Sequence, residues 1–184
     1  ALSQEARLFN YKWYAALAYI RANRLNHTVI RGPHDRFGLM ASGKAYNDTR
    51  QALLDLGLDE ARCNELGIRL HKVGVVWPLE PQGVQAFAHG LREVLVIEEK
   101  RAIIEPQIKE QLYHWPDAQR PSVRGKWEHP EGGGDFLLRP QHELNPGLIA
   151  RAIARRLSAL GVDADTQARI EARLNLLDAK ERSL

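Results

Sequence analysis

The segment 93–97 constrains the fold of this chain more than any other, because it contains four apolar residues in a row, Val94, Leu95, Val96 and Ile97. A strand with apolar side chains on both faces has to be covered on both faces, which is typical of a central strand in a parallel sheet. Parallel strands are joined by crossover connections, which are usually helices. We therefore expect the rest of the chain to supply helices for both faces of one sheet.

Strand and helix patterns alternate along the chain as this expectation requires. Besides 93–97, strand patterns occupy residues 28–30, 36–41, 68–73 and 123–127. Helix patterns occupy residues 5–24, 59–66, 82–89, 104–112 and 146–160, with one further helix capped by Asn47 or Asp48 and ending at Leu56, and a last one that starts at Asp163 or Asp165. This order predicts an open α/β sheet, mainly parallel, with helices on both faces.

The expected organisation is one α/β domain flanked by helices. Its parts are an N-terminal helical segment (1–27) packed on the core, the α/β domain (28–161) and a C-terminal helix (162–184). In the first part, Phe9, Trp13, Leu17 and Ile20 follow one another at spacings of four, four and three, as on one face of a helix. We interpret this stripe as packing against the core or an interface, not as a ligand-binding set.

Composition excludes several classes of protein. The 184 residues are 44% hydrophobic, which is ample for a core, and the net charge of +3 is too small to indicate a nucleic-acid-binding face. The single cysteine, Cys63, excludes an iron–sulfur cluster or a disulfide framework within the chain. No apolar run approaches the roughly 18 residues that a membrane-spanning helix needs. The chain has neither a signal-peptide pattern nor an initiator methionine, so we expect a cytoplasmic domain that is part of a longer protein.

Ligands of open α/β sheets bind beyond the carboxyl ends of the strands, which directs attention to residues 42–44, 77–80 and 98–101. The candidate site residues in these segments are Lys44, Trp77, Glu98, Glu99, Lys100 and Arg101. The last four follow a buried strand directly, and a charge near the protected end of a sheet needs a partner. The carboxylates could serve as acid or base or hold a cationic partner. An ion-pair network within the run or between domains is the interpretation that we favour.

Other motifs indicate no self-sufficient active site. Ser42-Gly43-Lys44 could begin an anion-binding turn, but Ala45 stands where a P-loop needs a hydroxyl residue. The seven histidines are scattered without the spacing of a zinc site. Neither a nucleophile elbow nor a dinucleotide-binding glycine motif is present. We expect Cys63 to be a buried, unreactive thiol.

Several motifs between Gly38 and Tyr113 resemble the indolepyruvate ferredoxin oxidoreductases, in particular their long fused proteobacterial form. The matching stretches are residues 38–46, 51–57, 67–74, 77–81, 87–91 and 96–101, and the resemblance extends to residues 18–23, 122–126 and the helix after Asn145. It implies the second domain of such an enzyme, similar to the transketolase C-terminal domain. That domain has three α/β/α layers and one antiparallel strand in an otherwise parallel sheet.

The resemblance also implies a thiamine-diphosphate enzyme that oxidatively decarboxylates aryl 2-oxoacids to acyl-CoA. Magnesium and iron–sulfur clusters would be further cofactors, and ferredoxin would accept the electrons. The Gly-Asp-Gly motif that binds the diphosphate and metal in the family is absent here, and one cysteine cannot bind a cluster. We therefore expect a non-catalytic domain that binds no cofactor itself. Its partners would be other domains of the same polypeptide, in a homodimeric parent, with neither nucleic acid nor membrane.

Two alternatives remain open at this stage. The first is a free-standing anion-binding module or small enzyme that uses Lys44 with Glu98 and Glu99. It requires that Lys44 and Glu98 lie within about 10 Å of one another. The second is a partner-docking module built on the arginines of the helix after Asn145, namely Arg151, Arg155 and Arg156.

Overall fold

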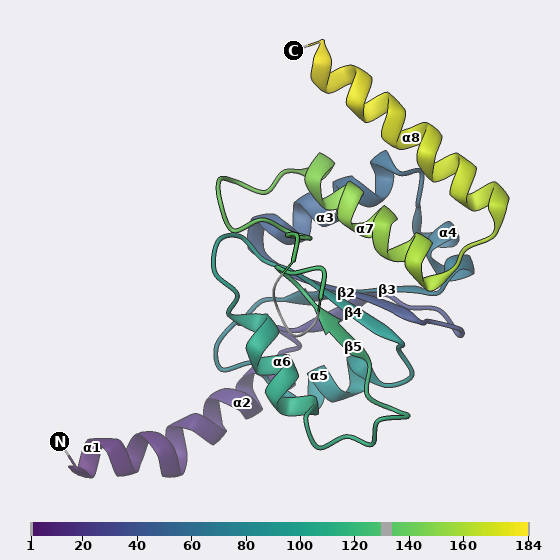
Figure 1. Ribbon diagram of the computed structural model, residues 1–184. Coiled ribbons are helices and arrows are strands. Elements are labelled where there is room, and N and C mark those ends of the chain that lie inside the picture. The colour runs from purple at the N-terminus through teal and green to yellow at the C-terminus, as the bar shows by residue number, and fades with distance from the viewer. Residues whose placement is uncertain (1, 130–133, 184) are drawn as a thin grey trace.

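The computed structural model describes residues 2–129 and 134–183 and contains one five-stranded sheet between two layers of helices (Figure 1). The sheet has the order β1-β3-β2-β4-β5. Its strands are β1 (His27–Ile30), β2 (Phe37–Ser42), β3 (Ile68–Val73), β4 (Glu93–Ile97) and β5 (Ser122–Arg124). Strands β2 to β5 pair in parallel, and the edge strand β1 runs antiparallel to β3. The mainly parallel sheet with one antiparallel strand is confirmed.

Strand β4 lies inside the sheet, as its apolar run predicts. It pairs with β2 on one side and β5 on the other, and all five of its residues are buried. Side chains that alternate along β4 enter different cores, because neighbouring residues of a strand point to opposite faces. Leu95 and Ile97 belong to one hydrophobic cluster, and Val94 and Val96 belong to the other.

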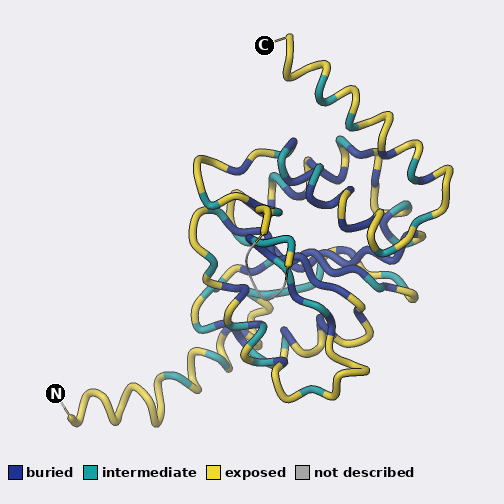
Figure 2. Tube along the Cα trace, viewed as in Figure 1, coloured by how far each residue is buried: buried dark blue, intermediate teal, exposed yellow. Residues whose placement is uncertain are grey.

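Different helices cover the two faces of the sheet, and the buried residues of Figure 2 concentrate where they meet it. The larger core lies under α3 (Gly43–Asp55), α4 (Glu60–Leu66), α7 (Pro146–Leu160) and the first half of α8 (Ala164–Arg182). The smaller core lies under α5 (Pro81–Ala88) and α6 (Ile104–Leu112). The structure therefore has the three α/β/α layers implied by the resemblance.

Most helix boundaries follow the predicted capping residues. The side chains of Asp59, Asn145 and Asp163 each accept a hydrogen bond from a backbone N–H three residues later, at the starts of α4, α7 and α8. Helix α4 ends at Gly67, whose φ of 74° is a left-handed conformation that favours glycine.

Two predicted boundaries are wrong. Helix α3 does not start near Asn47 or Asp48 but at Gly43, because β2 passes into it without a loop and Gly43 takes a φ of 51° at the junction. Strand β5 ends at Arg124, short of the predicted residue 127, because the next residues turn to the Glu105 carboxylate, which accepts the Lys126 N–H at 3.3 Å. The sequence Gly132-Gly133-Gly134-Asp135 also predicts a turn, of which residues 132 and 133 lie outside the described residues.

The N-terminal helical segment projects from the body of the domain (Figure 1). It comprises α1 (Leu2–Arg7), the π-helical turn η1 (Leu8–Lys12) and α2 (Trp13–Ala22). All residues from 2 to 12 are exposed, Trp13 and Leu17 are half-buried, and Ile20 is buried. Within this chain Ile20 is thus buried in the core and Phe9 is not, so for Phe9 packing at an interface stays a prediction. In the described part of the chain, no helix is both long and apolar enough to cross a membrane.

Candidate functional site at the carboxyl edge of the sheet

A cavity of about 320 Å³ lies where β2 and β4 end. Its lining residues are Ser42, Gly43, Lys44, Ala45, Val76, Glu98, Glu99, Arg101 and Ile103. The structure thus brings together four of the six residues that the sequence singled out, Lys44, Glu98, Glu99 and Arg101. Trp77 and Lys100 are not among the lining residues.

Lys44 is surrounded by carboxylates. Its Nζ lies 2.5 Å from Asp48 Oδ2, 3.0 Å from Glu143 Oε1 and 3.5 Å from Glu99 Oε1, and it donates a hydrogen bond to the Leu144 carbonyl at 2.9 Å. Hydrogen bonds to Asp48 and Glu143 raise the pKa of Lys44 above its ordinary value. The ammonium group is therefore protonated and already engaged, and an anion at this point would meet three carboxylates.

Glu98 is committed to the start of α6. Its carboxylate accepts backbone N–H groups from Ile103 at 3.0 Å, Ile104 at 2.7 Å and Glu105 at 3.1 Å. These are N–H groups that a helix start leaves without intrahelical partners, so Glu98 acts as a cap from outside the helix. Both carboxylate oxygens of Glu98 are therefore occupied by backbone donors within the domain.

The remaining members of the charged run have separate environments. Glu99 Oε1 is buried, has no hydrogen bond among the described residues, and has Lys44 at 3.5 Å as its ion-pair partner. Lys100, with a φ of 50°, and Arg101 are exposed. The two glutamates thus contact groups outside the run, so the hypothesis of a network among these four residues is wrong.

Trp77 lies beside the cavity and belongs to a different contact. Its ring packs edge-to-face on Trp13 of α2, with 5.1 Å between ring centroids, although Trp77 remains 64% exposed. The side chains of Arg21 and Glu80 form an ion pair at 2.7 Å between α2 and the start of α5. These two contacts attach the projecting helix to the carboxyl edge of the sheet.

Sequence reasoning missed Lys126, a buried cation behind the cavity. It is 6% exposed, and its Nζ donates to the carbonyl oxygen of Glu98. Burial lowers the pKa of Lys126, and the nearby negative charges of Glu98 and Glu105 partly oppose this shift. The burial of Lys126 could not be predicted from the neighbouring sequence, because its partners lie more than twenty residues away along the chain.

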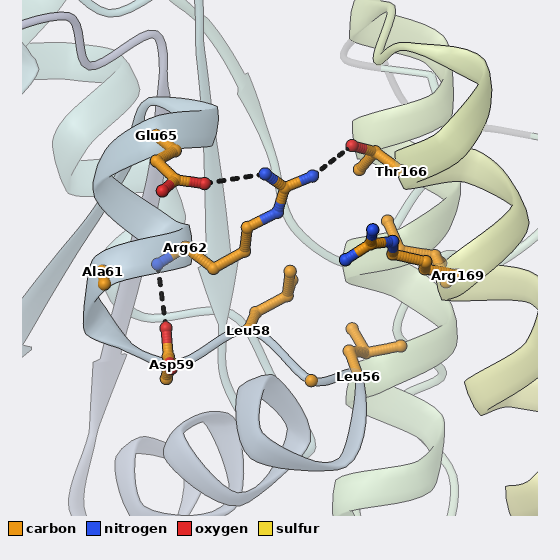
Figure 3. A pocket seen from close by; sticks show the side chains of 10 residues that line it. Leu56, Leu58, Asp59, Ala61, Arg62, Glu65, Thr166 and Arg169 are labelled. Atoms are coloured by element: carbon orange, nitrogen blue, oxygen red, sulfur yellow. Dashed lines mark hydrogen bonds and ion pairs between the residues drawn. The ribbon is translucent and has the colours of Figure 1, made fainter.

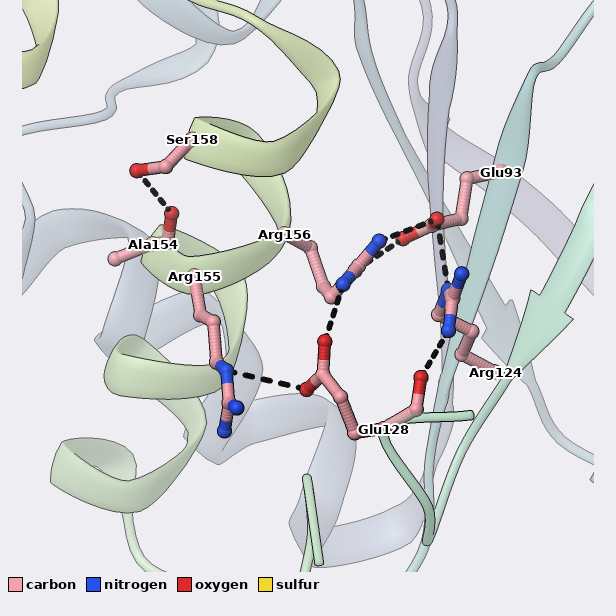
Figure 4. A network of polar contacts seen from close by, with 7 residues as sticks. All are labelled: Glu93, Arg124, Glu128, Ala154, Arg155, Arg156 and Ser158. Carbon is pink, nitrogen blue, oxygen red and sulfur yellow. Dashed lines mark hydrogen bonds and ion pairs between the residues drawn. The ribbon is translucent and has the colours of Figure 1, made fainter. Parts of the chain in front are cut away.

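A second missed network lies at the amino end of β4 (Figure 4). The Arg156 guanidinium of α7 donates to both oxygens of Glu93, at 2.7 and 2.9 Å, and to Glu128 at 2.5 Å. Arg124 also binds Glu93, at 3.0 Å, and Arg155 pairs with Glu128 at 3.2 Å. These bonds connect α7 to the sheet and to the segment after β5.

The arginines proposed for partner docking are therefore engaged within the chain. Arg156 is 6% exposed, whereas docking of a partner on its side chain would require an accessible guanidinium. Arg151 pairs with Asp178 and, at 2.8 Å, with Glu181 of α8. The structure thus disfavours a docking module built on this helix.

A further cavity of about 320 Å³ lies between α4 and α8 (Figure 3). Arg62 spans it, with Glu65 Oε2 at 2.7 Å from one guanidinium nitrogen and Thr166 Oγ1 at 2.5 Å from the other. The backbone N–H of Arg62 donates to Asp59 at 2.8 Å. These contacts hold the two helices together, and we assign this cavity a structural role.

The carboxyl edge of the sheet does not fit thiamine diphosphate with its metal. Within residues 2–129 and 134–183, no group of three or more histidine, cysteine, aspartate or glutamate side chains is arranged to hold a metal ion. At the carboxyl edge a diphosphate would meet the carboxylates around Lys44. The buried Cys63 has its pKa raised to about 12 by burial, which agrees with the expected unreactive thiol.

The chain is similar to known oxidoreductases. Residues 26–184 match the family described as the indolepyruvate ferredoxin oxidoreductase middle domain. The indolepyruvate oxidoreductase subunit IorA of Pyrococcus horikoshii is 32% identical over 81 residues, which is 44% of this chain and 11% of the relative. The same subunit of Methanothermobacter thermautotrophicus is 34% identical over 91 residues, 48% of this chain and 13% of the relative.

The chain also resembles parts of solved enzyme structures. A 2-oxoglutarate:ferredoxin oxidoreductase from Magnetococcus marinus aligns over 72% of this chain and 19% of its own, with a TM-score of 0.48 and 13% identity. A split-gene transketolase aligns over 72% and 41%, with a TM-score of 0.47 and 15% identity. The family match covers all five strands and the helices that follow them. The chain therefore belongs to the indolepyruvate ferredoxin oxidoreductase middle-domain family.

Proposed function

We propose that this chain is a non-catalytic domain of a 2-oxoacid:ferredoxin oxidoreductase of the indolepyruvate type. The parent enzyme would be cytoplasmic and homodimeric, in the long fused form, with ferredoxin as electron acceptor. Thiamine diphosphate, magnesium and iron–sulfur clusters would be bound by its other domains. The family match supports this proposal, and the aligned segment spans only 11% to 13% of the curated relatives. The engaged charges at the carboxyl edge are consistent with an architectural role.

The observation that carries the proposal is the exposure of large aromatic side chains on the projecting helix and beside it. These side chains, which we call the exposed aromatic residues, are Phe9, Tyr11, Tyr14, Tyr19 and Trp77, each between 62% and 71% exposed. Phenylalanine, tyrosine and tryptophan are enriched at protein interfaces. We assign the exposed aromatic residues to contact with another domain of the same enzyme, since most of the length of the relatives lies outside the aligned segment.

The charged candidates would act at the same edge. Lys100 and Arg101 are exposed and available to a neighbouring domain, where charges at the rim of an interface set fit and orientation. Lys44, Glu98 and Glu99 would hold the shape of this edge through the bonds described above. Trp77 connects the two surfaces, because its neighbour Val76 lines the carboxyl-edge cavity.

Hydrogen exchange tests the docking assignment. We expect backbone amides of residues 2–19 to exchange rapidly in the isolated chain and to be protected in the parent enzyme. Tyr11→Ser in the parent should lower assembly or activity, whereas Tyr113→Ser, at a tyrosine 69% exposed on another surface, should not. Equal exchange in the two contexts would refute the assignment.

Calorimetry tests the absence of catalytic function in this domain. Titration of the purified 184 residues with thiamine diphosphate should give no Mg²⁺-dependent saturable heat at micromolar concentrations. Binding at micromolar affinity or better that requires Mg²⁺ would place the cofactor site in this chain and overturn the proposal. Circular dichroism of the same sample confirms that the chain tested is folded.

A further inference from the structure

A separate cavity of about 430 Å³ lies between the edge strand β1, the end of the N-terminal segment and helix α5. Its lining residues are Arg24, Asn26, His27, Thr28, Arg31, His71, Gly83, Ala86 and Phe87. None of these residues lines the carboxyl-edge cavity. Its volume falls within the range of about 300–1,000 Å³ that is usual for small-molecule sites.

The lining of this cavity is basic. It contains two arginines and two histidines and no aspartate or glutamate. The guanidinium groups of Arg24 and Arg31 form no ion pair or hydrogen bond with any part of the chain that the structure describes. This contrasts with Arg62, Arg69, Arg151 and Arg156, each of which is paired with a carboxylate. Two free cations over a cavity without carboxylates favour an anionic ligand.

The backbone holds two of these basic residues next to one another. Arg24 has a φ of 51°, which residues other than glycine adopt infrequently, and its carbonyl oxygen lies 3.0 Å from Nδ1 of His27. Arg24 N–H also donates to Arg21 O at 3.1 Å. The turn between α2 and β1 therefore places Arg24 and His27 together at the rim of the cavity.

His71 supplies a buried polar atom without a partner. The residue is 2% exposed, and its Nδ1 lies 3.1 Å from the Thr28 hydroxyl oxygen. Its Nε2 is buried and has no hydrogen-bond partner within the described chain. Buried polar atoms in folded proteins are nearly always satisfied, so this nitrogen points to a ligand atom that completes its bonding.

The protonation of His71 suits that role. Burial, followed by the charge of His27, lowers the pKa of His71 to about 4, so the ring is neutral at physiological pH. When the Thr28 hydroxyl donates to Nδ1, the ring proton resides on Nε2. Nε2 is then a donor for an acceptor oxygen, while the ring packs 4.8 Å from that of Phe87.

We propose that this cavity binds a phosphorylated small molecule, with phosphate oxygens on Arg24 and Arg31 and one ligand oxygen on Nε2 of His71. Guanidinium groups suit phosphate, because their N–H groups match its oxygens in pairs. The organic part of the ligand lies against Gly83, Ala86 and Phe87 of α5. The inference is independent of the architectural function proposed above and adds a ligand site to a domain that otherwise supplies contacts.

Titrations of the purified 184-residue chain test the proposal, with inorganic pyrophosphate and ADP as probes. Calorimetry should show saturable binding, and Arg24→Gln or Arg31→Gln should weaken it at least tenfold. Arg50→Gln is the matched control, because Arg50 is an exposed arginine on α3 that is not among the lining residues. Ala86→Leu changes an exposed residue of the cavity wall and should block ADP without unfolding the chain.

The imidazole ¹⁵N resonances of His71 provide a second readout. Saturation with pyrophosphate should shift the Nε2 resonance, and ADP should bind more tightly than pyrophosphate. An absence of binding at millimolar probe, an unchanged His71 spectrum, or equal weakening by Arg50→Gln would overturn the site. Equal affinities for pyrophosphate and ADP would overturn the role given to the apolar wall.

Discussion

Replacing Arg156 by alanine tests the energetics of the network at the amino end of β4. The Arg156 and Glu93 side chains are 8% and 5% exposed and form two hydrogen bonds of 2.7 and 2.9 Å. Arg156→Ala removes both bonds together with the contact to Glu128, and leaves Glu93 with Arg124 alone. Breaking a buried ion pair on one side costs about 3–5 kcal/mol, because the remaining charge stays buried. Because the bond between Arg124 and Glu93 remains, we expect the variant to lose about 3 kcal/mol of unfolding free energy, the lower limit of this range.

Urea unfolding followed by circular dichroism measures this cost as a change in the midpoint at constant slope. In a thermal scan, about 3 kcal/mol corresponds to roughly 6–12 °C for a domain of this size. The control is Arg155→Ala on the same helix, since Arg155 is 52% exposed and has a single contact with Glu128 at 3.2 Å. An exposed pair of this kind contributes at most about 1 kcal/mol.

A double variant separates the cost of a broken pair from the net contribution of the intact one. Replacing a buried pair by apolar residues of similar volume is often neutral or stabilising. We therefore expect Glu93→Met with Arg156→Met to be clearly more stable than Arg156→Met alone. Equal losses for Arg156→Ala and Arg155→Ala, or strictly additive losses in the double variant, would refute the reasoning.

Three further predictions concern single buried positions. Because the pKa of His71 is lowered to about 4 in the folded state, its contribution to stability is complete above about pH 6.5 and is lost as the pH falls toward 4. Over this pH interval the free energy of unfolding of the wild-type chain should therefore fall by up to about 3 kcal/mol more than that of His71→Gln. Cys63 should remain unreactive toward a thiol reagent at pH 8 until urea unfolds the chain, because burial raises the pKa of its thiol to about 12. Rapid modification of Cys63 in the native protein would contradict this prediction. Gly67→Ala should lower the free energy of unfolding by about 2 kcal/mol or more, because the φ of Gly67 is 74° and a Cβ there would lie 2.5 Å from the His34 carbonyl oxygen. Gly90→Ala is the control, because Gly90 has a similar φ of 79° but open space around it. It should cost about 1 kcal/mol in the same unfolding assay.

The elements that sequence reasoning predicted correctly are those with local signals. The apolar run 94–97 identified the central strand, and Asp59 with Gly67 bounded α4, because capping and left-handed turns depend on a few neighbouring residues. The start of α3 was misplaced because Asn47 and Asp48 are good capping residues. At this position the helix has already begun, at the strand end.

The partners of the charged residues had no such signals. Arg156 lies seven residues after Ile149 and three after Ile153, so helical periodicity places it on the buried face of α7. Its charge alone suggested solvent, because the local sequence does not show which carboxylate would pair with it. Its buried position depends on Glu93, which is 63 residues away in the sequence. Lys44 likewise bonds to Leu144, 100 residues away. The structure places four of the six candidates, Lys44, Glu98, Glu99 and Arg101, around one cavity, while their bonding depends on tertiary neighbours.

Those bonds decide what the carboxyl edge of this sheet can do. In an open α/β fold this edge offers helix starts and strand ends to a ligand. Here Glu98 takes up the N–H groups at the start of α6, and the carboxylates around Lys44 neutralise its charge. Lys44 and Glu98 are thus already bonded within the domain, which leaves the exposed Lys100 and Arg101 as the charged groups of this edge that a neighbouring domain could contact. The projecting helix is attached beside that edge through the contact between Trp13 and Trp77. The proposed interdomain role therefore predicts that a neighbouring domain contacts the helix and this edge together.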